Sequence, residues 1–182
     1  MRRFVVTQNI SLDGSIEFLG DWFDPSDQDE ELAELMREYS AQEDLLVLGR
    51  QTFEDFRSYW PHQTDDTTGV AEILDRVQKY VVSGTMTDPA WQNSTVLGAD
   101  WLDRLRELKA VDGQEMSLTG SIRLCHAVLE AGLVDEVRLF VHPVSQGGGR
   151  RLFPDGYETS SLRCLESRLF SGGVVLLRYA TT

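Results

Sequence analysis

The feature that most constrains the fold is an uninterrupted apolar run from Leu45 to Leu48, which leads directly into Gly49 and Arg50. A strand with no polar residue in alternation has to be covered on both faces. Such strands are typical of the centre of a parallel sheet, where helices lie on either side. The run therefore predicts an α/β protein built around a mostly parallel sheet.

Helical and strand patterns alternate along the rest of the chain. Strands are predicted at 4–6, 80–82, 116–118, 134–142, 162–170 and 174–179, and helices at 29–40, 70–77, 102–108 and 122–131. Ser171-Gly172-Gly173 joins the last two strands, which indicates an antiparallel pair at the edge of the sheet. With 182 residues and neither a linker nor a repeat, residues 1–182 are expected to form one domain.

Three apolar strands end in turns of glycine and small hydroxyl residues, in the segments LVLGRQT, YVVSGT and SLTGSI. Ligands of open α/β sheets bind beyond the carboxyl ends of the strands. The free N–H groups of helices that follow such turns favour anions, and Arg50 offers a guanidinium that suits phosphate. We therefore expect the three turns to meet at one rim and to bind a ligand with several phosphates, such as a dinucleotide.

The first of these turns contains a helix-start signal. Thr52-Phe53-Glu54-Asp55 fits a capping box and predicts Thr52 as the N-cap. Neither the glycine fingerprint of dinucleotide-binding folds nor a P-loop occurs anywhere in the sequence. A phosphate site would therefore have to be assembled from separate turns.

Composition narrows the range of partners. The chain has 30 acidic and 17 basic residues, a net charge of −13, which argues against nucleic acid and against an anionic membrane surface. The apolar run near the N-terminus is too short for a signal peptide or a membrane span, so a cytoplasmic location is expected. Cys125 and Cys164 are expected to be buried free thiols, and no metal-binding motif is present.

Six motifs are spread over nearly the whole chain. They are SLDG at 11–14, LVLGRQT at 46–52, YWP at 59–61, VVSGT at 81–85, TGS at 119–121 and LEAGLVDEVRLFVHPVSQGGGRRLF at 129–153. In this combination the chain resembles the dihydrofolate reductase-like superfamily. The branch it resembles most is the reductase domain of the bifunctional riboflavin-biosynthesis deaminase–reductase and its stand-alone relatives. The zinc motifs of the deaminase half are absent, which fits a stand-alone reductase domain.

The resemblance implies a three-layer fold around a mostly parallel sheet, with NADPH as the hydride donor. It implies that Arg50 and Thr52, in the turn with Gly49, hold the 2′-phosphate and pyrophosphate region of the cofactor. Ser83 and Gly84 would flank the adenosine ribose and its phosphate.

The resemblance places the pyrophosphate at the third turn. Gly120 and Ser121 would bind it together with the backbone N–H groups of Ile122 and Arg123. Many relatives carry a second glycine where Ile122 stands, so the chain departs from the family pattern at this position.

On the nicotinamide side, the resemblance places Thr7, Gln8, Asn9, Asp13 and Ile16 near the hydride. Reduction of a C=N bond also needs a proton, which a buried carboxyl with a raised pKa or a bound water can supply. Asp13 is the candidate for this role, although an Asp-Gly pair also shapes turns.

Two tryptophans are candidates for substrate binding. Trp22 and Trp60 have the large flat rings that could stack on a heterocycle, or they could cap the apolar core. The resemblance also implies a homodimer, for which the strand at 134–141, the segment GGGRRLF and the C-terminal strand pair could supply an apolar surface.

The function expected from these observations is an NADPH-dependent reductase of a small heterocyclic or imine substrate. The family suggests 5-amino-6-(5-phosphoribosylamino)uracil, the pyrimidine of riboflavin synthesis. One alternative is a dihydrofolate reductase, which would need an acid on the inward face of the helix at 29–40. That face carries Leu32, Leu35, Met36 and Tyr39 instead. The other alternative is a nucleotide-binding module without catalysis.

Overall fold

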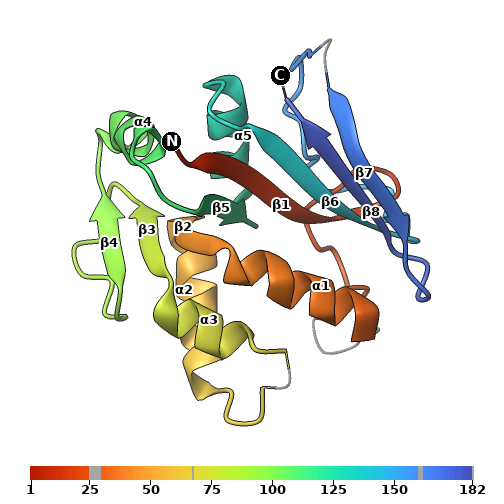
Figure 1. The fold of residues 1–182 in the computed structure, drawn as a ribbon, viewed down its shortest axis with the longest axis horizontal. Coiled ribbons are helices and arrows are strands. Elements are labelled where there is room, and N and C mark those ends of the chain that lie inside the picture. Colours follow the sequence, from red (N-terminus) through yellow and green to blue (C-terminus); the bar gives the residue numbers. More distant parts are fainter. Residues whose placement is uncertain (25–29, 67, 160–161, 182) are drawn as a thin grey trace.

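The computed structural model describes residues 1–24, 30–66, 68–159 and 162–181. Its centre is an eight-stranded sheet with the order β4-β3-β2-β5-β1-β6-β8-β7 (Figure 1). The first six strands of this order are parallel, and β8 and β7 add an antiparallel edge. The strands are β1 (Arg3–Ser11), β2 (Glu43–Gly49), β3 (Gln78–Val82), β4 (Ser94–Leu97), β5 (Glu115–Thr119), β6 (Glu136–His142), β7 (Arg163–Leu169) and β8 (Val175–Ala180).

Helices cover both faces of the sheet. They are α1 (Glu30–Ala41), α2 (Arg50–Tyr59), the 3₁₀ helix η1 (Trp60–His62), α3 (Val70–Arg76), α4 (Trp101–Ala110) and α5 (Ile122–Glu130). In Figure 1, α4 and α5 lie above the sheet and α1, α2 and α3 lie below it. The expected three-layer α/β fold with an antiparallel C-terminal edge is confirmed.

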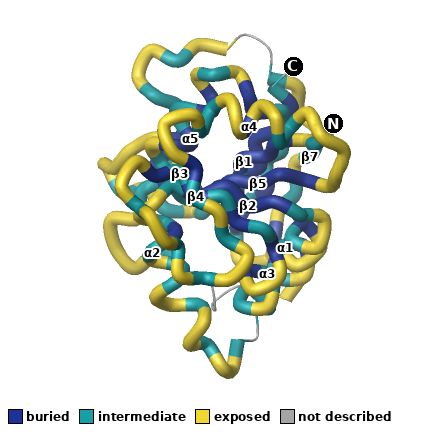
Figure 2. Tube along the Cα trace, turned by 90° about the vertical axis from the view of Figure 1, so that its left-hand side faces the viewer, coloured by how far each residue is buried: buried dark blue, intermediate teal, exposed yellow. Residues whose placement is uncertain are grey.

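Strand β2 shows why its sequence is apolar throughout. Leu45 and Val47 belong to the core cluster under α4 and α5, whereas Leu46 and Leu48 belong to the cluster under α2 and α3. Figure 2 shows β1, β2 and β5 as buried strands at the centre, enclosed by segments with exposed outer faces. Covering both faces of β2 removes four large apolar side chains from water, each of which contributes about 1.5–3 kcal/mol.

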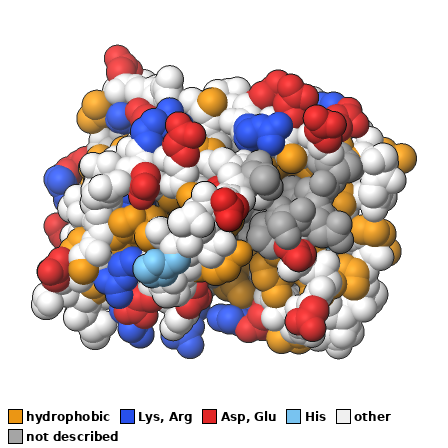
Figure 3. Space-filling view, turned by 90° about the horizontal axis from the view of Figure 1, so that it is seen from below, with side chains coloured by type: hydrophobic (Ala, Val, Ile, Leu, Met, Phe, Trp, Pro, Cys, Tyr) orange, Lys and Arg blue, Asp and Glu red, His pale blue; other side chains and the backbone are white. Residues whose placement is uncertain are grey.

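Helix α1 packs on the other end of the sheet. Leu32, Leu35 and Tyr39 are its buried residues, and they form a cluster with Phe140 of β6 and Leu176 of β8. None of these inward positions carries a carboxylate. In Figure 3, the face seen from the side of α1–α3 carries scattered acidic and basic side chains, with apolar side chains visible between them.

A group of paired charged side chains lies between α1 and the sheet, and three of its members are buried. Arg138 of β6 lies 3.1 Å from a carboxylate oxygen of Glu115 and 3.6 Å from one of Glu136, and all three side chains are buried. Arg3 reaches the same two carboxylates at 2.7 and 3.2 Å, and Arg178 lies 2.7 Å from Glu136. We call these five residues the ionic cluster.

Two further residues adjoin the ionic cluster. The ring of Tyr39 lies under the guanidinium of Arg138, 3.7 Å from ring centre to Cζ, so α1 is joined to the sheet by a cation–π contact. At the start of β2, burial raises the pKa of Glu43 to about 7, with a smaller contribution from the charge of Glu115. Glu43 is therefore partly protonated at neutral pH.

The structure corrects two predictions. Cys125 is buried, and burial raises the pKa of its thiol to about 12, but Cys164 is exposed on the edge strand β7. Strand β4, only four residues long, was not predicted because Ser94 to Leu97 is short and follows a polar loop.

Helix α1 is described from Glu30, so the predicted start at Asp29 falls outside the described residues. Among the described residues, none of the helices has the length and apolar character that crossing a bilayer requires.

Candidate functional site

The three predicted turns lie at one edge of the sheet. Strands β3, β2 and β5 are parallel neighbours, so their carboxyl ends share this edge. After β2 the chain enters α2 on one face, and after β5 it enters α5 on the other face. Where neighbouring strands send their helices to opposite faces, a crevice opens at the carboxyl ends, and α/β proteins bind ligands there.

The turns after β2 and β5 are in direct contact. The Gly49 amide donates to Ser121 Oγ at 2.9 Å, and the Ser121 amide donates to Thr52 Oγ1 at 3.0 Å. A Cβ on Gly120 would lie only 3.1 Å from the Thr52 methyl group, and Gly120 has a φ of +58°, so this position favours glycine. The predicted convergence of these two turns is thus confirmed.

Gln8 of β1 connects to the same place. Its amide nitrogen donates to the Gly120 carbonyl at 2.8 Å, and its amide oxygen accepts from the Gly120 amide at 3.2 Å. These bonds help to hold Ser121 at a φ of +48°, a conformation that costs a non-glycine residue about 1–2 kcal/mol. We call Gln8, Gly49, Thr52, Gly120 and Ser121 the turn junction.

Two of the predicted cofactor-binding residues also have a structural role in the turn junction. The side chains of Gln8 and Thr52 already have hydrogen-bond partners in the protein, so they orient the turns. The predicted capping box is wrong, because α2 begins at Arg50 with Gly49 as its N-cap and Thr52 lies inside the first turn. The sequence did not reveal the role of the Thr52 hydroxyl, because the amide that it accepts from, that of Ser121, lies 69 residues away.

Both helices at the turn junction begin without a side-chain cap. Gly49 precedes α2 and Ser121 precedes α5, and neither provides a side-chain hydrogen bond to its helix. The first N–H groups of a helix have no partner within the helix, and two helix starts in contact concentrate this partial positive charge. The arrangement therefore suits a phosphate or pyrophosphate group.

Arg50 lies at the first position of α2. Its side chain is half exposed, and its guanidinium lies 3.2 Å from both carboxylate oxygens of Glu54, one helical turn away. Such an exposed pair contributes only about 0.3–0.5 kcal/mol, so a phosphate can replace Glu54 as the partner. Arg123, at the second position of α5, is exposed, and the Ile122 side chain packs against the core.

In the turn after β3, one of the two predicted ligand-binding residues is buried and the other is exposed. Ser83 is buried, and its hydroxyl accepts from the amides of Thr85 and Met86 at 3.2 and 2.9 Å. Gly84 is exposed, and a Cβ built on it would meet no atom within 4 Å. In this turn the glycine leaves room for a ligand, whereas the serine hydroxyl shapes the turn.

The predicted nicotinamide side lies along the carboxyl half of β1. The Thr7 hydroxyl is buried without a hydrogen-bond partner among the described residues, and Ile16 is buried in the core. Asn9 Oδ1 lies 3.0 Å from Nε2 of His142, which is at the carboxyl end of the neighbouring strand β6. Burial lowers the pKa of His142 below its usual value. The sequence reading gave His142 no role, because it could not show that β6 pairs with β1.

Asp13 does not have the raised pKa that a proton donor needs. Hydrogen bonds from the Ser11 hydroxyl and from the amides of Gly147 and Gln146 lower its pKa to about 2. Asp13 is therefore ionised at neutral pH, and the prediction of a protonated carboxyl at this position is wrong. Its contacts join the turn after β1 to the loop after β6.

The two tryptophans lie in separate aromatic groups. Trp22 contacts Phe18, Phe23 and His142, and its Nε1 donates to Gln146 Oε1 at 2.6 Å. The other tryptophan, in η1, packs against the apolar cluster of α2 and α3. Of the two, Trp22 contacts His142, which is hydrogen-bonded to Asn9 on the predicted nicotinamide side.

Comparisons with known proteins agree with this architecture. A family model described as the RibD C-terminal domain matches residues 3–176. A Bacillus subtilis (strain 168) protein described as "Uncharacterized protein YyaP" is 30% identical over 180 residues, covering 98% of this chain and 94% of that protein.

Solved structures show the same fold. A putative riboflavin biosynthesis protein from Shewanella sp. PV-4 is similar with a TM-score of 0.72 and 22% identity, covering 99% of each chain. A pyrimidine reductase-like protein from Corynebacterium diphtheriae has a TM-score of 0.67 and 16% identity, covering 100% of this chain and 92% of that one. RibD from Acinetobacter baumannii has a TM-score of 0.64 and 15% identity, and the match covers 100% of this chain and 58% of that one.

Proposed function

The chain belongs to the RibD C-terminal domain family, and on that premise we propose that it is an NADPH-dependent reductase of a small heterocyclic or imine substrate. The observation that carries the proposal is the turn junction. It sets two uncapped helix starts side by side at the carboxyl edge of the sheet. A phosphorylated dinucleotide suits this arrangement of backbone donors.

Individual residues fit different parts of the cofactor. The amides of Ile122 and Arg123 at the start of α5 would bind the pyrophosphate, and Arg50 would bind the 2′-phosphate once it leaves Glu54. Gly84 leaves open space for the adenosine ribose. The bound cofactor supplies the hydride, and the protein positions it against the substrate.

The substrate would lie along the carboxyl half of β1. Thr7 offers a hydroxyl that has no partner among the described residues, and Asn9 is held by His142. Histidine is the side chain that commonly exchanges protons near neutral pH, so His142 replaces Asp13 as the candidate for delivering a proton, and Asn9 would orient its ring. A pyrimidine such as 5-amino-6-(5-phosphoribosylamino)uracil is the substrate that the family suggests, in a cytoplasmic homodimeric enzyme.

The proposal is tested by titrating the protein with NADPH and NADH and following cofactor fluorescence. We expect Arg50→Gln to weaken NADPH binding by about ten-fold, since loss of a charge-assisted contact costs about 1.5–3 kcal/mol, and to leave NADH binding unchanged. Arg104→Gln, which removes an equally exposed arginine from α4, is the matched control. A wild-type protein that binds neither nucleotide would contradict the proposal.

Two alternative functions remain, a dihydrofolate reductase and a nucleotide-binding module without catalysis. A dihydrofolate reductase is disfavoured because the buried residues of α1 are Leu32, Leu35 and Tyr39, none of them acidic. A nucleotide-binding module without catalysis is favoured by one observation, the three hydrogen bonds that the Asp13 carboxylate accepts, which oppose its protonation. Binding of NADPH without oxidation, across a panel of pyrimidines, pterins and imines, would support that module.

A further inference from the structure

The side chain of Gln146 joins two loops beside the predicted nicotinamide side. The first loop, residues 12–24, follows β1, and the second loop, residues 143–151, follows β6 and contains Gln146. The Gln146 amide nitrogen donates to the Glu17 carbonyl at 2.8 Å. Its amide oxygen accepts from the Leu19 backbone amide at 2.8 Å and from Trp22 Nε1 at 2.6 Å. One side chain thus serves three polar groups of the first loop.

These three partners suit a primary amide. The Leu19 amide and the Trp22 indole N–H need an acceptor, whereas the Glu17 carbonyl needs a donor. A carboxylate only accepts and an ammonium only donates, so neither kind of side chain could serve all three. Methionine has a similar length but offers only a weakly accepting sulfur. It is therefore the substitution that removes these bonds while filling the space.

The hydrogen bond to Gln146 sets the orientation of the Trp22 indole. The indole leans on the imidazole of His142, with ring centres 5.1 Å apart and an angle of 59° between the ring planes. Phe18 packs edge-on against the same indole, with ring centres 5.0 Å apart. An indole N–H is only a donor, so without Gln146 the ring would turn to find water as its acceptor. The position of the indole on His142 therefore depends on Gln146.

The imidazole of His142 has a defined tautomer in this arrangement. Its Nε2 lies 3.0 Å from Asn9 Oδ1, and an amide oxygen only accepts, so Nε2 donates and Nδ1 is the nitrogen that can exchange a proton. Trp22 and Phe23 pack against the ring, and neither titrates near neutral pH. Burial lowers the pKa of His142. Displacing the indole would admit water and raise this pKa toward its usual value.

Other contacts hold the two loops together without the Gln146 side chain. The Glu17 carboxylate lies 2.6 Å from the Arg150 guanidinium, and the Asp13 carboxylate accepts from two backbone amides of the second loop. The remaining carboxylates of the first loop are both exposed, namely Asp21 and Asp24. Loss of the Gln146 side chain should therefore leave the loops in place and release the indole.

We propose that Gln146 is a positioning residue, which holds the Trp22 indole against His142 and so limits the water that reaches the imidazole. Its role in catalysis rests on the proposed function. In that reaction the nitrogen of the substrate C=N bond takes a proton from Nδ1 of the imidazolium while the carbon takes the hydride, and the imidazole then regains a proton from water. The placing of the indole by Gln146 does not depend on that reaction.

The test uses the full chain labelled with ¹⁵N and has two readouts, the exchange of the Trp22 indole proton with water and the titration of the His142 ring. The variants Trp22→Phe and His142→Gln assign the two signals. In the wild type the indole proton should be protected from exchange. In Gln146→Met it should exchange about ten-fold faster, as expected for the loss of one hydrogen bond, and the pKa of His142 should rise toward its usual value.

Two further variants show whether the effect passes through the indole. Arg150→Gln is the matched control, because it removes the other side-chain contact between the same two loops, and it should leave both readouts unchanged. Trp22→Phe lacks the indole N–H, so adding Gln146→Met to it should not change the pKa of His142 further. Urea denaturation checks that each variant is folded.

The outcomes separate this proposal from the proposed function. An unprotected indole proton in the wild type would overturn the proposal without any variant, and so would unchanged readouts in Gln146→Met or equal changes in Arg150→Gln. If both readouts change as expected but the wild type neither binds nor oxidises NADPH, Gln146 still places the indole and the reductase is rejected. If the wild type oxidises NADPH but neither readout changes, the reductase stands and the role of Gln146 is rejected.

Discussion

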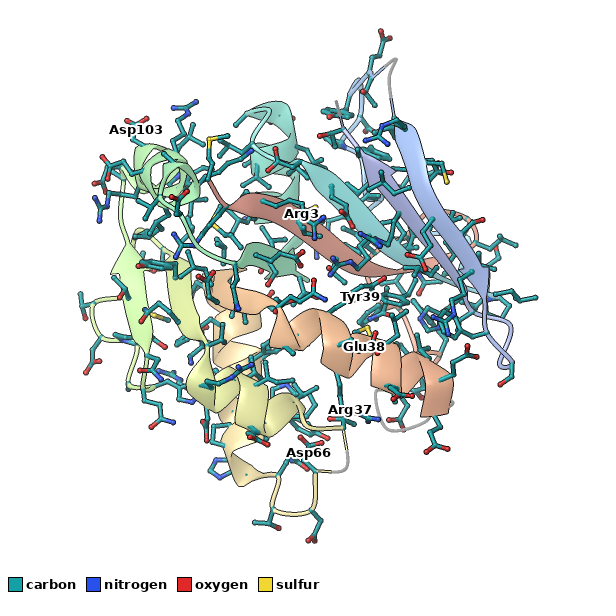
Figure 4. All side chains as sticks on the ribbon, in the orientation of Figure 1. Arg3, Arg37, Glu38, Tyr39, Asp66 and Asp103 are labelled. Carbon is teal, nitrogen blue, oxygen red and sulfur yellow. The ribbon has the colours of Figure 1, made fainter. Side chains whose placement is uncertain are left out.

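The ionic cluster and the turn junction handle polar groups in opposite ways. In the ionic cluster, the buried Arg138 side chain is paired with two carboxylates and lies over the Tyr39 ring. In Figure 4, Arg3 of the ionic cluster is labelled on β1 and Tyr39 on α1. In the turn junction, side chains fix the shape of the backbone while the first amides of α2 and α5 are left without caps.

This difference separates stability from binding. Buried charges must be paired, because leaving one alone costs several kcal/mol. Helix starts at the surface can stay uncapped at a smaller cost, about 1 kcal/mol each, and the unpaired donors then remain for a ligand. Changes in the ionic cluster should therefore act mainly on unfolding, whereas changes at the turn junction should act mainly on cofactor binding.

The largest expected effect is on the ionic cluster. Arg138→Met leaves Glu115 and Glu136 with fewer partners in a buried layer, and we expect it to lower the free energy of unfolding by about 3–5 kcal/mol. Urea denaturation measures this. Arg106→Met, which removes an exposed pair with Asp103, should change stability by less than about 1 kcal/mol. A mutant as stable as the wild type would refute the structural role of the cluster.

The second effect depends on pH and concerns Glu43. Its pKa in the folded protein, about 7, lies above its ordinary value of 4.5, so the folded state binds this proton more tightly. The resulting stabilisation is complete below about pH 4.5 and is lost as the pH rises through 7. Relative to Glu43→Gln, the wild type should lose roughly 1–3 kcal/mol between pH 5 and 8.

Denaturation curves of both proteins at several pH values measure this difference. His142, whose pKa is lowered by burial, acts in the opposite direction in the same pH range, but its contribution cancels when the two proteins are compared. Parallel pH profiles for the wild type and Glu43→Gln would show that Glu43 does not titrate as expected.

The third expected effect concerns Thr52 of the turn junction. Thr52→Val keeps the shape of the side chain but removes the acceptor of the Ser121 amide. We expect a loss of about 1 kcal/mol in unfolding free energy and a loss of NADPH affinity of about ten-fold, which corresponds to 1.4 kcal/mol. Thr52→Ser keeps the hydroxyl and should restore affinity. Equal affinity in the valine and serine variants would argue against a positioning role.

The smallest effect concerns the partner of Arg50. Glu54→Gln removes the carboxylate that competes with a phosphate for the guanidinium, so NADPH affinity should rise about two-fold, in line with 0.3–0.5 kcal/mol for such a pair. NADH affinity should not change. Asp55→Asn removes the neighbouring charge, which accepts from Gln51, and serves as the control. Equal gains in both variants would indicate a general charge effect.

The sequence was sufficient for the layers of the fold and for the edge that carries the site. The apolar run of β2 required helices on both faces, and strand ends rich in glycine indicated the turns. The pattern of apolar and polar residues predicts these features because it is set by residues that are close together in the sequence, within one helix or strand. Strand β4 was missed, since four residues are too few for a pattern.

The details of the site could not be predicted, because they depend on residues that are distant in sequence. Thr52 fits a local capping box, but in the fold its hydroxyl is the acceptor for Ser121. Asp13 was expected to be protonated, but hydrogen bonds from the nearby Ser11 hydroxyl, and from amides of the loop after β6 more than 130 residues away, lower its pKa. Local patterns identify candidate residues, whereas their protonation and partners are set by tertiary contacts.

The turn junction joins β1 to the turn after β5 across 112 residues, and α2 to the same turn across 69. During synthesis, a nascent chain that ends before Gly120 lacks one half of the crevice proposed to bind the nucleotide, however well its first strands have formed. Nucleotide would therefore bind only to chains that have completed the sheet as far as β5. At a nucleotide concentration one hundred times the dissociation constant, binding would raise the free energy of unfolding of such chains by about 2.7 kcal/mol.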